Sequence, residues 1–454
     1  MSMQRRHFIA LATSAMGVAA APARAAAGPL PISALGVDAG QFGVRPGSAD
    51  DQTRALQRAI DETARTGTPL ALAPGIYRTG QLRLSSGTHL VGARGATRLL
   101  PTQGESLLSG TGAEHVTLRG LVLDGAGRPL PERRGLVQLE SCKAVKIADC
   151  TIAGSGRNGI VCIAVAGEVS DSTIAQTADA GLFAVDSAGL LLARNRIDRA
   201  GNNGIQVWRS MAGEDGTLII DNRLENIGNR SGGSGQYGNA INVFRAGNVI
   251  VRGNRINNCA FSAVRGNAAS NLQIEGNSVS NTREVALYVE FAFEGAVIAN
   301  NSVDLAAVGI SVTNFNEGGR LAVVQGNIIR NLLPRRPAGT DPGDAAGVGI
   351  SVEADTAVTG NVIENAPTAG MMLGWGHYLR DVAVTGNVVR KADIGIAVSV
   401  APGAGTVLIA NNVISETVQG AIVGMSRAKP VTEDLSRTGA EQYAHITLNG
   451  NRVR

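Results

Sequence analysis

Aromatic residues are scarce in this chain: Phe, Trp and Tyr make up 3% of its 454 residues. A hydrophobic content of 44% is nevertheless ample for a core, so that core must be built from Val, Ile, Leu and Ala. The 59 glycines are too many for a helical protein and indicate many turns. The composition therefore favours a turn-rich protein with an aliphatic core.

An excess of charge of one sign is also lacking in most of the chain. The formal net charge is +4, but residues 1–25 contain Arg5, Arg6 and Arg24 and no acidic residue. The remainder is therefore close to neutral and gives no electrostatic reason to expect a nucleic-acid partner. Any attraction to an anion must come from a local cluster of basic residues.

Residues 1–25 have the features of an export signal. The pair Arg5-Arg6 precedes a mild apolar run from Phe8 to Ala21, and Ala23-Arg24-Ala25 offers small residues for cleavage. The paired arginines resemble a twin-arginine signal, which implies the twin-arginine translocation machinery as a partner. An ordinary secretory signal is the alternative. The run is too short for a membrane anchor, so we expect a periplasmic or secreted protein without a membrane span.

Cysteine is rare, with four residues in the chain. Export would permit disulfides. Cys142, Cys150 and Cys162 nevertheless occupy strand or strand-edge positions of a repeat, where a buried thiol packs as a small hydrophobic group. We therefore expect reduced core cysteines, and a Cys150–Cys162 bridge is the alternative.

An asparagine-centred unit recurs from about residue 145 to the end of the sequence. It contains a small or polar residue, Asn, one further residue, and Ile, Val or Leu, as in Gly253-Asn254-Arg255-Ile256. The base period between copies is 23 to 26 residues, with insertions in a few turns. Self-similarity at such a period is typical of a solenoid. The central asparagines are Asn195, Asn222, Asn254, Asn277, Asn301, Asn327, Asn361, Asn387, Asn412 and Asn451.

A second pattern, Gly or Ala followed by alternating apolar residues, comes about nine residues after most of these asparagines, as in 204–207. No hairpin-type turn recurs, which argues against an antiparallel sandwich. Each period instead fits one coil of an all-β, right-handed parallel β-helix of about twelve coils, with strands about 4.8 Å apart. Stacked asparagine amides would form a ladder, and Asn tolerates the left-handed backbone of a corner. We therefore assign the asparagines a structural role.

The open ends of such a solenoid need caps. Residues 51–66 predict an N-terminal capping helix, because Asp50-Asp51 supply carboxylates at its start, small apolar residues line one face, and Gly67 ends it. A charged loop at 425–444 should shield the last coil. We divide the chain into a signal peptide (1–25), an N-terminal cap with the first coils (26–123) and the repeats (124–454), the last two forming one domain.

The N-terminal region carries a family resemblance. The stretches Phe42-Gly43, Asp50-Asp51 before a helix, and Pro74-Gly75-Ile76-Tyr77 resemble those of pectate-lyase-like β-helix proteins. With its leader, the chain is similar to bacterial, twin-arginine-exported β-helix repeat proteins without an assigned activity. That superfamily contains lyases, hydrolases, epimerases and phage tailspikes, so the resemblance implies the fold and leaves the reaction open. The aspartate motifs of polygalacturonase-type hydrolases are absent.

In this superfamily the polysaccharide lies along one sheet, and the resemblance points to the strands that carry the Gly-Ile-x-Val pattern. Alternation turns residues such as Ile205 inward and Gln206 outward. Aromatic, arginine and carboxylate side chains gather at the outward and strand-end positions, and these groups suit an acidic sugar. The insertions 228–238 and 332–347 should rise beside this strip. The candidate substrate-binding residues are Trp208, Arg209, Asn242, Phe244, Arg245, Glu353 and Trp375.

The favoured chemistry is β-elimination or C5 epimerisation of a uronate in an acidic polysaccharide. A base removes the proton beside the carboxyl group while a cation or an arginine stabilises the resulting charge. Arg265, Tyr288 and His377 are candidates for proton transfer, and Arg209 and Arg245 are candidates for the clamp. Glu290 or Glu353 could hold Ca²⁺. The candidate catalytic residues are Arg265, Tyr288, Glu290 and His377.

Two alternatives stay open. In a hydrolase, Glu290 and Glu353 would act together two coils apart, or about 9.6 Å, near the upper limit of about 9.5 Å for inverting enzymes. A non-catalytic, carbohydrate-binding solenoid would instead bind without cleavage and without cation dependence. Periodicity also predicts that one groove contains Trp208, Arg245, Arg265, Tyr288 and Glu290.

Overall fold

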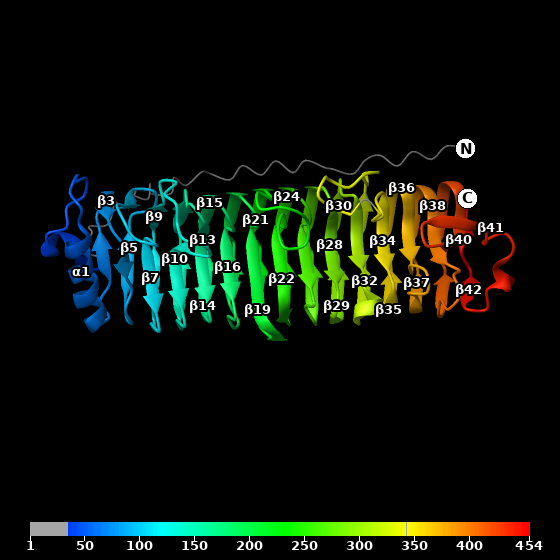
Figure 1. Ribbon diagram of the computed structural model, residues 1–454, viewed down its shortest axis with the longest axis horizontal. Helices are drawn as coiled ribbons and strands as arrows, with labels where there is room; N and C mark the ends of the chain where they lie inside the picture. Colours follow the sequence, from blue (N-terminus) through cyan, green and yellow to red (C-terminus); the bar gives the residue numbers. More distant parts are fainter. Residues whose placement is uncertain (1–34, 342) are drawn as a thin grey trace, which may run out of the picture.

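The computed structural model describes residues 35–341 and 343–454. They form a long parallel β-solenoid whose strands stand side by side from α1 (Thr53–Thr66) at one end to β40 (Val413–Ser426) at the other (Figure 1). The predicted signal peptide, residues 1–25, lies outside the described residues, so export stays a prediction.

One side of the solenoid is a sixteen-stranded sheet, which we call the first sheet. The solenoid has somewhat more coils than the twelve expected, and its coils before residue 145 lack the asparagine unit. Its strands, in spatial order, are β1 (Val37–Asp38), β2 (Leu70–Leu72), β5 (His89–Gly92), β8 (Thr117–Arg119), β11 (Val145–Ala148), β14 (Gly167–Ser170), β17 (Leu191–Ala193), β20 (Leu218–Ile220), β23 (Ile250–Arg252), β26 (Leu272–Glu275), β29 (Glu294–Ala299), β32 (Arg320–Gln325), β35 (Ala354–Thr359), β37 (Arg380–Thr385), β39 (Val407–Ala410) and β42 (Ile446–Asn449).

Most of the remaining strands form two further rows, and the first contains the strands with the Gly-Ile-x-Val pattern, whose outward side chains include the candidate site residues. We call it the site row. Its strands are β4 (Leu82–Arg83), β7 (Leu108–Thr111), β10 (Gly135–Glu140), β13 (Asn158–Ile163), β16 (Leu182–Val185), β19 (Ile205–Glu214), β22 (Ile241–Gly247), β25 (Val264–Asn267), β28 (Val285–Glu290), β31 (Val308–Val312) and β34 (Val348–Val352).

In the coils that contain the asparagine unit, the strands of the third row begin directly after the central asparagine. Three long strands bend from this row into the site row. Each long strand pairs in both rows; β36, for example, pairs with β33 through Val362 and with β34 through Ala369. The strands of this row, with the long strands, are β3 (Gly75–Thr79), β6 (Thr97–Pro101), β9 (Leu121–Asp124), β12 (Thr151–Ala153), β15 (Thr173–Thr177), β18 (Arg196–Ala200), β21 (Arg223–Ile227), β24 (Arg255–Cys259), β27 (Ser278–Thr282), β30 (Ser302–Asp304), β33 (Ile328–Arg330), β43 (Arg452–Val453), β36 (Val362–Leu373), β38 (Val388–Ser399) and β40.

The asparagines form the predicted ladder. From Asn195 to Asn412, each side-chain amide donates to the carboxamide oxygen of the next ladder asparagine at 2.9–3.1 Å, and Asn451 accepts the last of these bonds. One detail of the expectation was wrong. The left-handed backbone belongs to the residue before each ladder asparagine, such as Gly276 (φ 62°) or Asn300 (φ 56°). The ladder asparagine therefore supplies hydrogen bonds, and its neighbour makes the corner.

The N-terminal helix packs as predicted on the first coils. Leu56, Ala59, Ile60 and Ala64 are buried, and Gly67 ends the helix in the left-handed conformation (φ 65°). The helix starts later than expected, with Gln52 at the N-cap position. The Asp51 carboxylate still accepts the Thr53 N–H at 2.9 Å, so it satisfies one of the free donors of the first turn. Short 3₁₀ helices occur at η2 (Ala39–Phe42), η3 (Phe315–Glu317) and η4 (Ala440–Gln442).

The C-terminal segment folds back onto the last coils as expected. β41 (Lys429–Asp434) pairs antiparallel with β40, and the Asp434 carboxylate accepts the N–H groups of Ala421 and Ile422 at 3.0 and 3.2 Å. Inside the solenoid, the four cysteines are buried and free. Burial raises the pKa of the Cys150 thiol to about 11, so this thiol is an inert core group.

Candidate functional site

The register of the site row follows the sequence prediction. Asn242, Arg265 and Tyr288 are direct neighbours on β22, β25 and β28. The residues that alternate with them along each strand point inward and are buried. Val243 and Val289 are examples. Strict alternation has therefore turned the candidate side chains to the outer face of the solenoid.

That outer face is covered at its centre. Asn242, Arg265 and Glu290 are only 3%, 7% and 2% exposed. The insertions 228–238 and 332–347 meet above them, where the Ser234 N–H donates to the Gly339 carbonyl at 3.4 Å. The expectation that these loops stand beside the strip was therefore wrong: they lie across it and exclude water from the middle of the row.

Beneath the loops lies a buried ion-pair network centred on Arg265. Its Nε–H and Nη2–H donate to both oxygens of Glu290 at 2.6 and 2.9 Å, and Nη1–H donates to Glu284 at 3.4 Å. The guanidinium also lies 4.7 Å from the centroid of the Tyr288 ring. Arg265 is therefore held on three sides, and its charge is neutralised by two carboxylates.

Glu284 and Arg336 complete the network, and sequence reasoning missed both. Arg336 Nη1–H donates to Glu284 at 3.4 Å and to Asp344 at 3.0 Å, while Nε–H donates to the Ala345 carbonyl at 2.8 Å. Burial raises the pKa of Glu284 in spite of the adjacent arginines. One usable signal was present: Arg336 is one of two basic residues in the 332–347 insertion, which was expected to lie close to the strip.

A cavity of about 190 Å³, which we call the Glu353 cavity, opens on one side of the network. Its lining includes Tyr288, Arg336, Asp344, Glu353 and Trp375. Burial raises the pKa of the Glu353 carboxyl, although it accepts the Phe315 N–H at 2.7 Å. Burial, reinforced by the Glu290 charge, also raises the pKa of the Tyr288 phenol. The cavity thus combines two groups suited to proton transfer, an arginine and an aromatic wall.

A second cavity of about 470 Å³, the Trp208 cavity, opens on the other side of the network. Trp208, Asn242, Phe244, Arg265 and Phe291 belong to its lining. The Trp208 indole N–H donates to the Asn242 side chain at 2.7 Å, and its ring lies 5.6 Å from that of Phe244 in an edge-to-face arrangement. This fixed aromatic surface is suited to stacking against sugar rings.

The five residues predicted to share one groove are divided between these places. Arg265 and Tyr288 are in contact but line different cavities, and Glu290 lines neither. Arg245 also lies outside both, and its guanidinium lies over the Phe244 ring, 4.7 Å from the ring centroid. The single groove was therefore wrong, because the two loops divide the strip.

Other candidates also lie apart from the cavities. Arg209 lines neither cavity and donates to the Ser187 carbonyl at 3.4 Å. His377 lines neither and packs against Tyr378, with ring centroids 4.0 Å apart. Within residues 35–341 and 343–454, no three His, Cys, Asp or Glu side chains gather as a metal site. Because Glu290 is engaged by Arg265, its carboxylate is not free to hold Ca²⁺.

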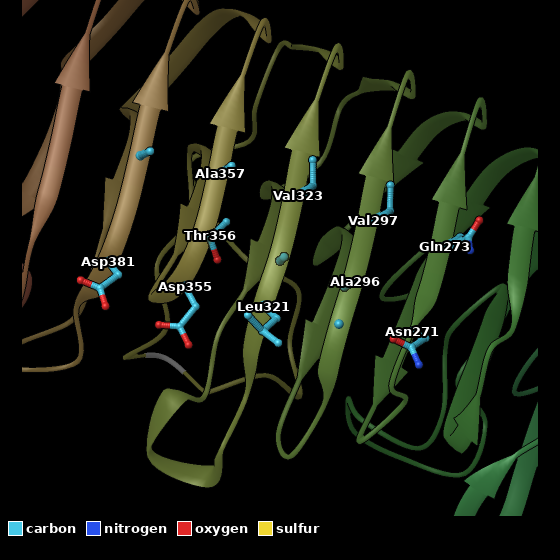
Figure 2. A pocket seen from close by; sticks show the side chains of 13 residues that line it. Asn271, Gln273, Ala296, Val297, Leu321, Val323, Asp355, Thr356, Ala357 and Asp381 are labelled. Atoms are coloured by element: carbon cyan, nitrogen blue, oxygen red, sulfur yellow. The ribbon is translucent and has the colours of Figure 1, made fainter.

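A cavity on the first sheet has a different character (Figure 2). Its floor is formed by apolar side chains such as Val297 and Val323, with Asp355 near one edge. Hydrogen bonds from Arg380 and Arg320 lower the pKa of Asp355 and keep it ionised. The two titratable groups of this lining, Asp355 and Asp381, lie at its edge, and Asp355 is already paired with two arginines, so the site row remains the candidate site.

Comparison with solved structures finds the same fold at low sequence identity. The mannuronan C-5 epimerase AlgE4 A-module of Azotobacter vinelandii is 16% identical, with a TM-score of 0.50 over 79% of this chain and 96% of that one. The GH87 α-1,3-glucanase of Streptomyces thermodiastaticus is 17% identical (TM-score 0.51, 94% and 70% covered). The N-terminal fragment of bacteriophage Phi29 gene product 12 is 15% identical (TM-score 0.53, 86% and 68% covered).

No curated protein matches the sequence. In the part of the chain that the structure describes, no helix is long and apolar enough to cross a membrane. The sequence does match a protein family, described as a right-handed β-helix region, in overlapping stretches at residues 108–228, 168–329 and 210–389. These stretches cover more than half of the chain, which agrees with the parallel coils and the asparagine ladder. The chain therefore belongs to the right-handed β-helix family.

Proposed function

We propose that this protein acts on an acidic polysaccharide by β-elimination or C5 epimerisation at the Glu353 cavity. The observation that carries the proposal is the meeting of Tyr288, Arg336, Glu353 and Trp375 in that cavity. These side chains come from a strand, an insertion and two strand ends, so only the coiling of the chain brings them together. They match the requirements of the reaction one by one.

The chemistry assigns each group a role. Ionised Glu353, whose raised pKa makes it a stronger base than an ordinary carboxylate, takes the proton from C5 of a uronate. Arg336 uses Nε and Nη1 in its contacts with Ala345, Glu284 and Asp344, so Nη2 is the group that would face the uronate carboxyl and stabilise the negative charge that develops there. The protonated Tyr288 phenol then donates its proton. In elimination the proton goes to the leaving oxygen as the C4–O bond breaks and the C4=C5 bond forms, and in epimerisation it goes to the opposite face of C5.

Arg265 acts through Tyr288 in this proposal. Its guanidinium is neutralised by carboxylates, so it orients the phenol ring and takes no part in proton transfer. Trp375 offers a stacking surface at the cavity wall, and the Trp208 cavity would hold a neighbouring part of the polymer. His377, Arg209 and Arg245 have no assigned role in the reaction.

Two further considerations support a polysaccharide substrate. The fold is shared with a mannuronan epimerase and an α-1,3-glucanase, whose names specify polysaccharides. The predicted twin-arginine leader would bring a folded protein to the periplasm or outside the cell, where such polymers occur. We therefore propose a periplasmic or secreted location.

Hydrolysis is a second candidate, favoured by one observation. Asp344 lines the same cavity as Glu353, so two carboxyl groups flank one space, as hydrolysis requires. This pair replaces the combination of Glu290 with Glu353 suggested by the sequence, because Asp344 lines the cavity and Glu290 does not.

A substrate screen tests these functions. The purified protein would be incubated with alginate, pectate and glycosaminoglycans, with and without EDTA. Ultraviolet absorbance would detect unsaturated products, NMR would detect epimerised residues, and reducing ends without absorbance would indicate hydrolysis. Elimination or epimerisation supports the first candidate. Binding without any product would instead support a non-catalytic carbohydrate-binding solenoid, and loss of activity in EDTA would indicate a cation such as Ca²⁺.

A further inference from the structure

The site row has another cavity, towards the N-terminal end from the Trp208 cavity. This space of about 240 Å³, the Arg157 cavity, lies between the strand ends of β10, β13, β16 and β19 and the 228–238 loop. Trp208 and Gln236 line both cavities, so they form a shared wall. The neighbouring coils of the row are seen side by side in Figure 1. The two cavities are thus adjacent spaces along one track.

Two arginines of this cavity have guanidinium groups that are not neutralised. Arg133 and Arg157 line it, and neither takes part in any ion pair found among the described residues. Two acidic residues are also present. Asp179 accepts a hydrogen bond from the Asn202 amide at 2.8 Å, and Glu132 is exposed at the rim. In contrast to Arg265, both arginines therefore retain donors for an anion.

Aromatic side chains provide the rest of a sugar-binding surface. The rings of Phe183 and Trp208 lie 5.2 Å apart in an edge-to-face arrangement across neighbouring coils. Tyr237, from the 228–238 loop, lies on the same lining. All three are partly exposed. A hexuronate ring presents an apolar face and a carboxylate, and this cavity offers matching partners for both.

We propose that the Arg157 cavity is a distal subsite that binds a uronate residue of the same polymer. This proposal rests on the proposed function of the Glu353 cavity. From β16 to β31 there are five strand spacings, or about 24 Å at about 4.8 Å each. A polymer several sugars long is therefore needed to occupy both places. The distal subsite holds the chain, while proton transfer occurs only at the Glu353 cavity.

The test compares the full-length double variant Arg133→Gln/Arg157→Gln with a matched control. Arg119→Gln removes an exposed arginine from β8 on the first sheet, away from the site row. Binding would be measured by calorimetry with polyguluronate, polygalacturonate and a neutral glucan, and turnover on long polymers and on short oligomers. Thermal unfolding would verify that each variant is folded.

We expect the double variant to bind polyuronate at least about 10-fold more weakly, because charged hydrogen bonds are lost. Its KM for long polymers should rise while kcat on short oligomers is unchanged, and the control should resemble the wild type. Unchanged uronate binding by a folded double variant, or equally strong binding of neutral glucan by the wild type, would overturn the subsite alone. Failure of the wild type to bind any uronate polymer would overturn both proposals.

Discussion

The Arg265 guanidinium donates to both oxygens of Glu290, at 2.6 and 2.9 Å, while it stacks on the Tyr288 ring at 4.7 Å. One buried cation thus satisfies a carboxylate and fixes the orientation of a phenol on the next coil. Sheet register makes this possible, because Arg265 pairs with Tyr288 and Asn267 pairs with Glu290. Arg265 is consequently a structural and positioning residue.

Arg265→Met should destabilise the fold strongly. It leaves Glu284 and Glu290 buried without their main cation, a change that costs about 3–5 kcal/mol for a buried pair. Urea unfolding would measure it, with the exposed Arg255→Met on β24 as a control within about 0.5 kcal/mol of wild type. Adding Glu290→Gln should recover part of the loss, and a fully additive double variant would contradict the proposed pairing.

Tyr288→Phe should separate chemistry from packing. The ring can still stack on Arg265, so stability should be almost unchanged, while removal of the donor hydroxyl should lower kcat by about 100-fold or more. Turnover on the substrate found in the screen is the measurement, and Tyr443→Phe near the C-terminus is the matched control. Full activity of a folded Tyr288→Phe protein would exclude the phenol as the proton donor.

Glu353 should make stability depend on pH in a defined direction. Burial raises its pKa above the ordinary value of 4.5, so the folded state favours the protonated form. Its stabilising contribution is complete below pH 4.5 and is lost as pH rises through the folded-state pKa. The free energy of unfolding of Glu353→Gln, relative to wild type, should therefore increase from pH 4 to neutral pH. A constant or opposite difference in urea titrations would contradict this burial effect.

The periodic features of the molecule were predictable from the sequence. Asn254 and Asn277 lie in register because each coil repeats the same backbone path, and alternation alone placed Arg265 beside Tyr288. The burial of that strip was not predictable. It depends on the contact between Ser234 and Gly339, in two insertions whose conformations follow no repeat. The pairing of Arg336 with Glu284 spans 52 positions and has no periodic signal.

Asn277→Ala should lower stability through the ladder. Its amide donates to Asn301 and to the Val251 carbonyl, both at 3.0 Å, and its oxygen accepts the Asn254 N–H at 2.9 Å. Leaving such buried groups unpaired costs about 1–3 kcal/mol. Denaturant unfolding would measure the loss, and the exposed Asn257→Ala on β24 should change stability by less than about 0.5 kcal/mol. Equal effects of the two changes would argue against the ladder as a source of stability.

Arg336→Ala should release the 332–347 insertion from the site row. Arg336 joins the Ala345 carbonyl, Asp344 and Glu284, so it ties the loop to itself and to the residue before β28. Removing it also leaves Glu284 with one arginine fewer in a buried position, which favours local opening by about 1–3 kcal/mol. Hydrogen exchange should therefore become about 10-fold faster or more in the loop, while the core strands β31 and β34 keep their protection. Arg335→Ala removes the neighbouring exposed arginine from the same loop and should leave exchange unchanged. If both variants exchange at the wild-type rate, the ion-pair network does not hold the loops across the strip.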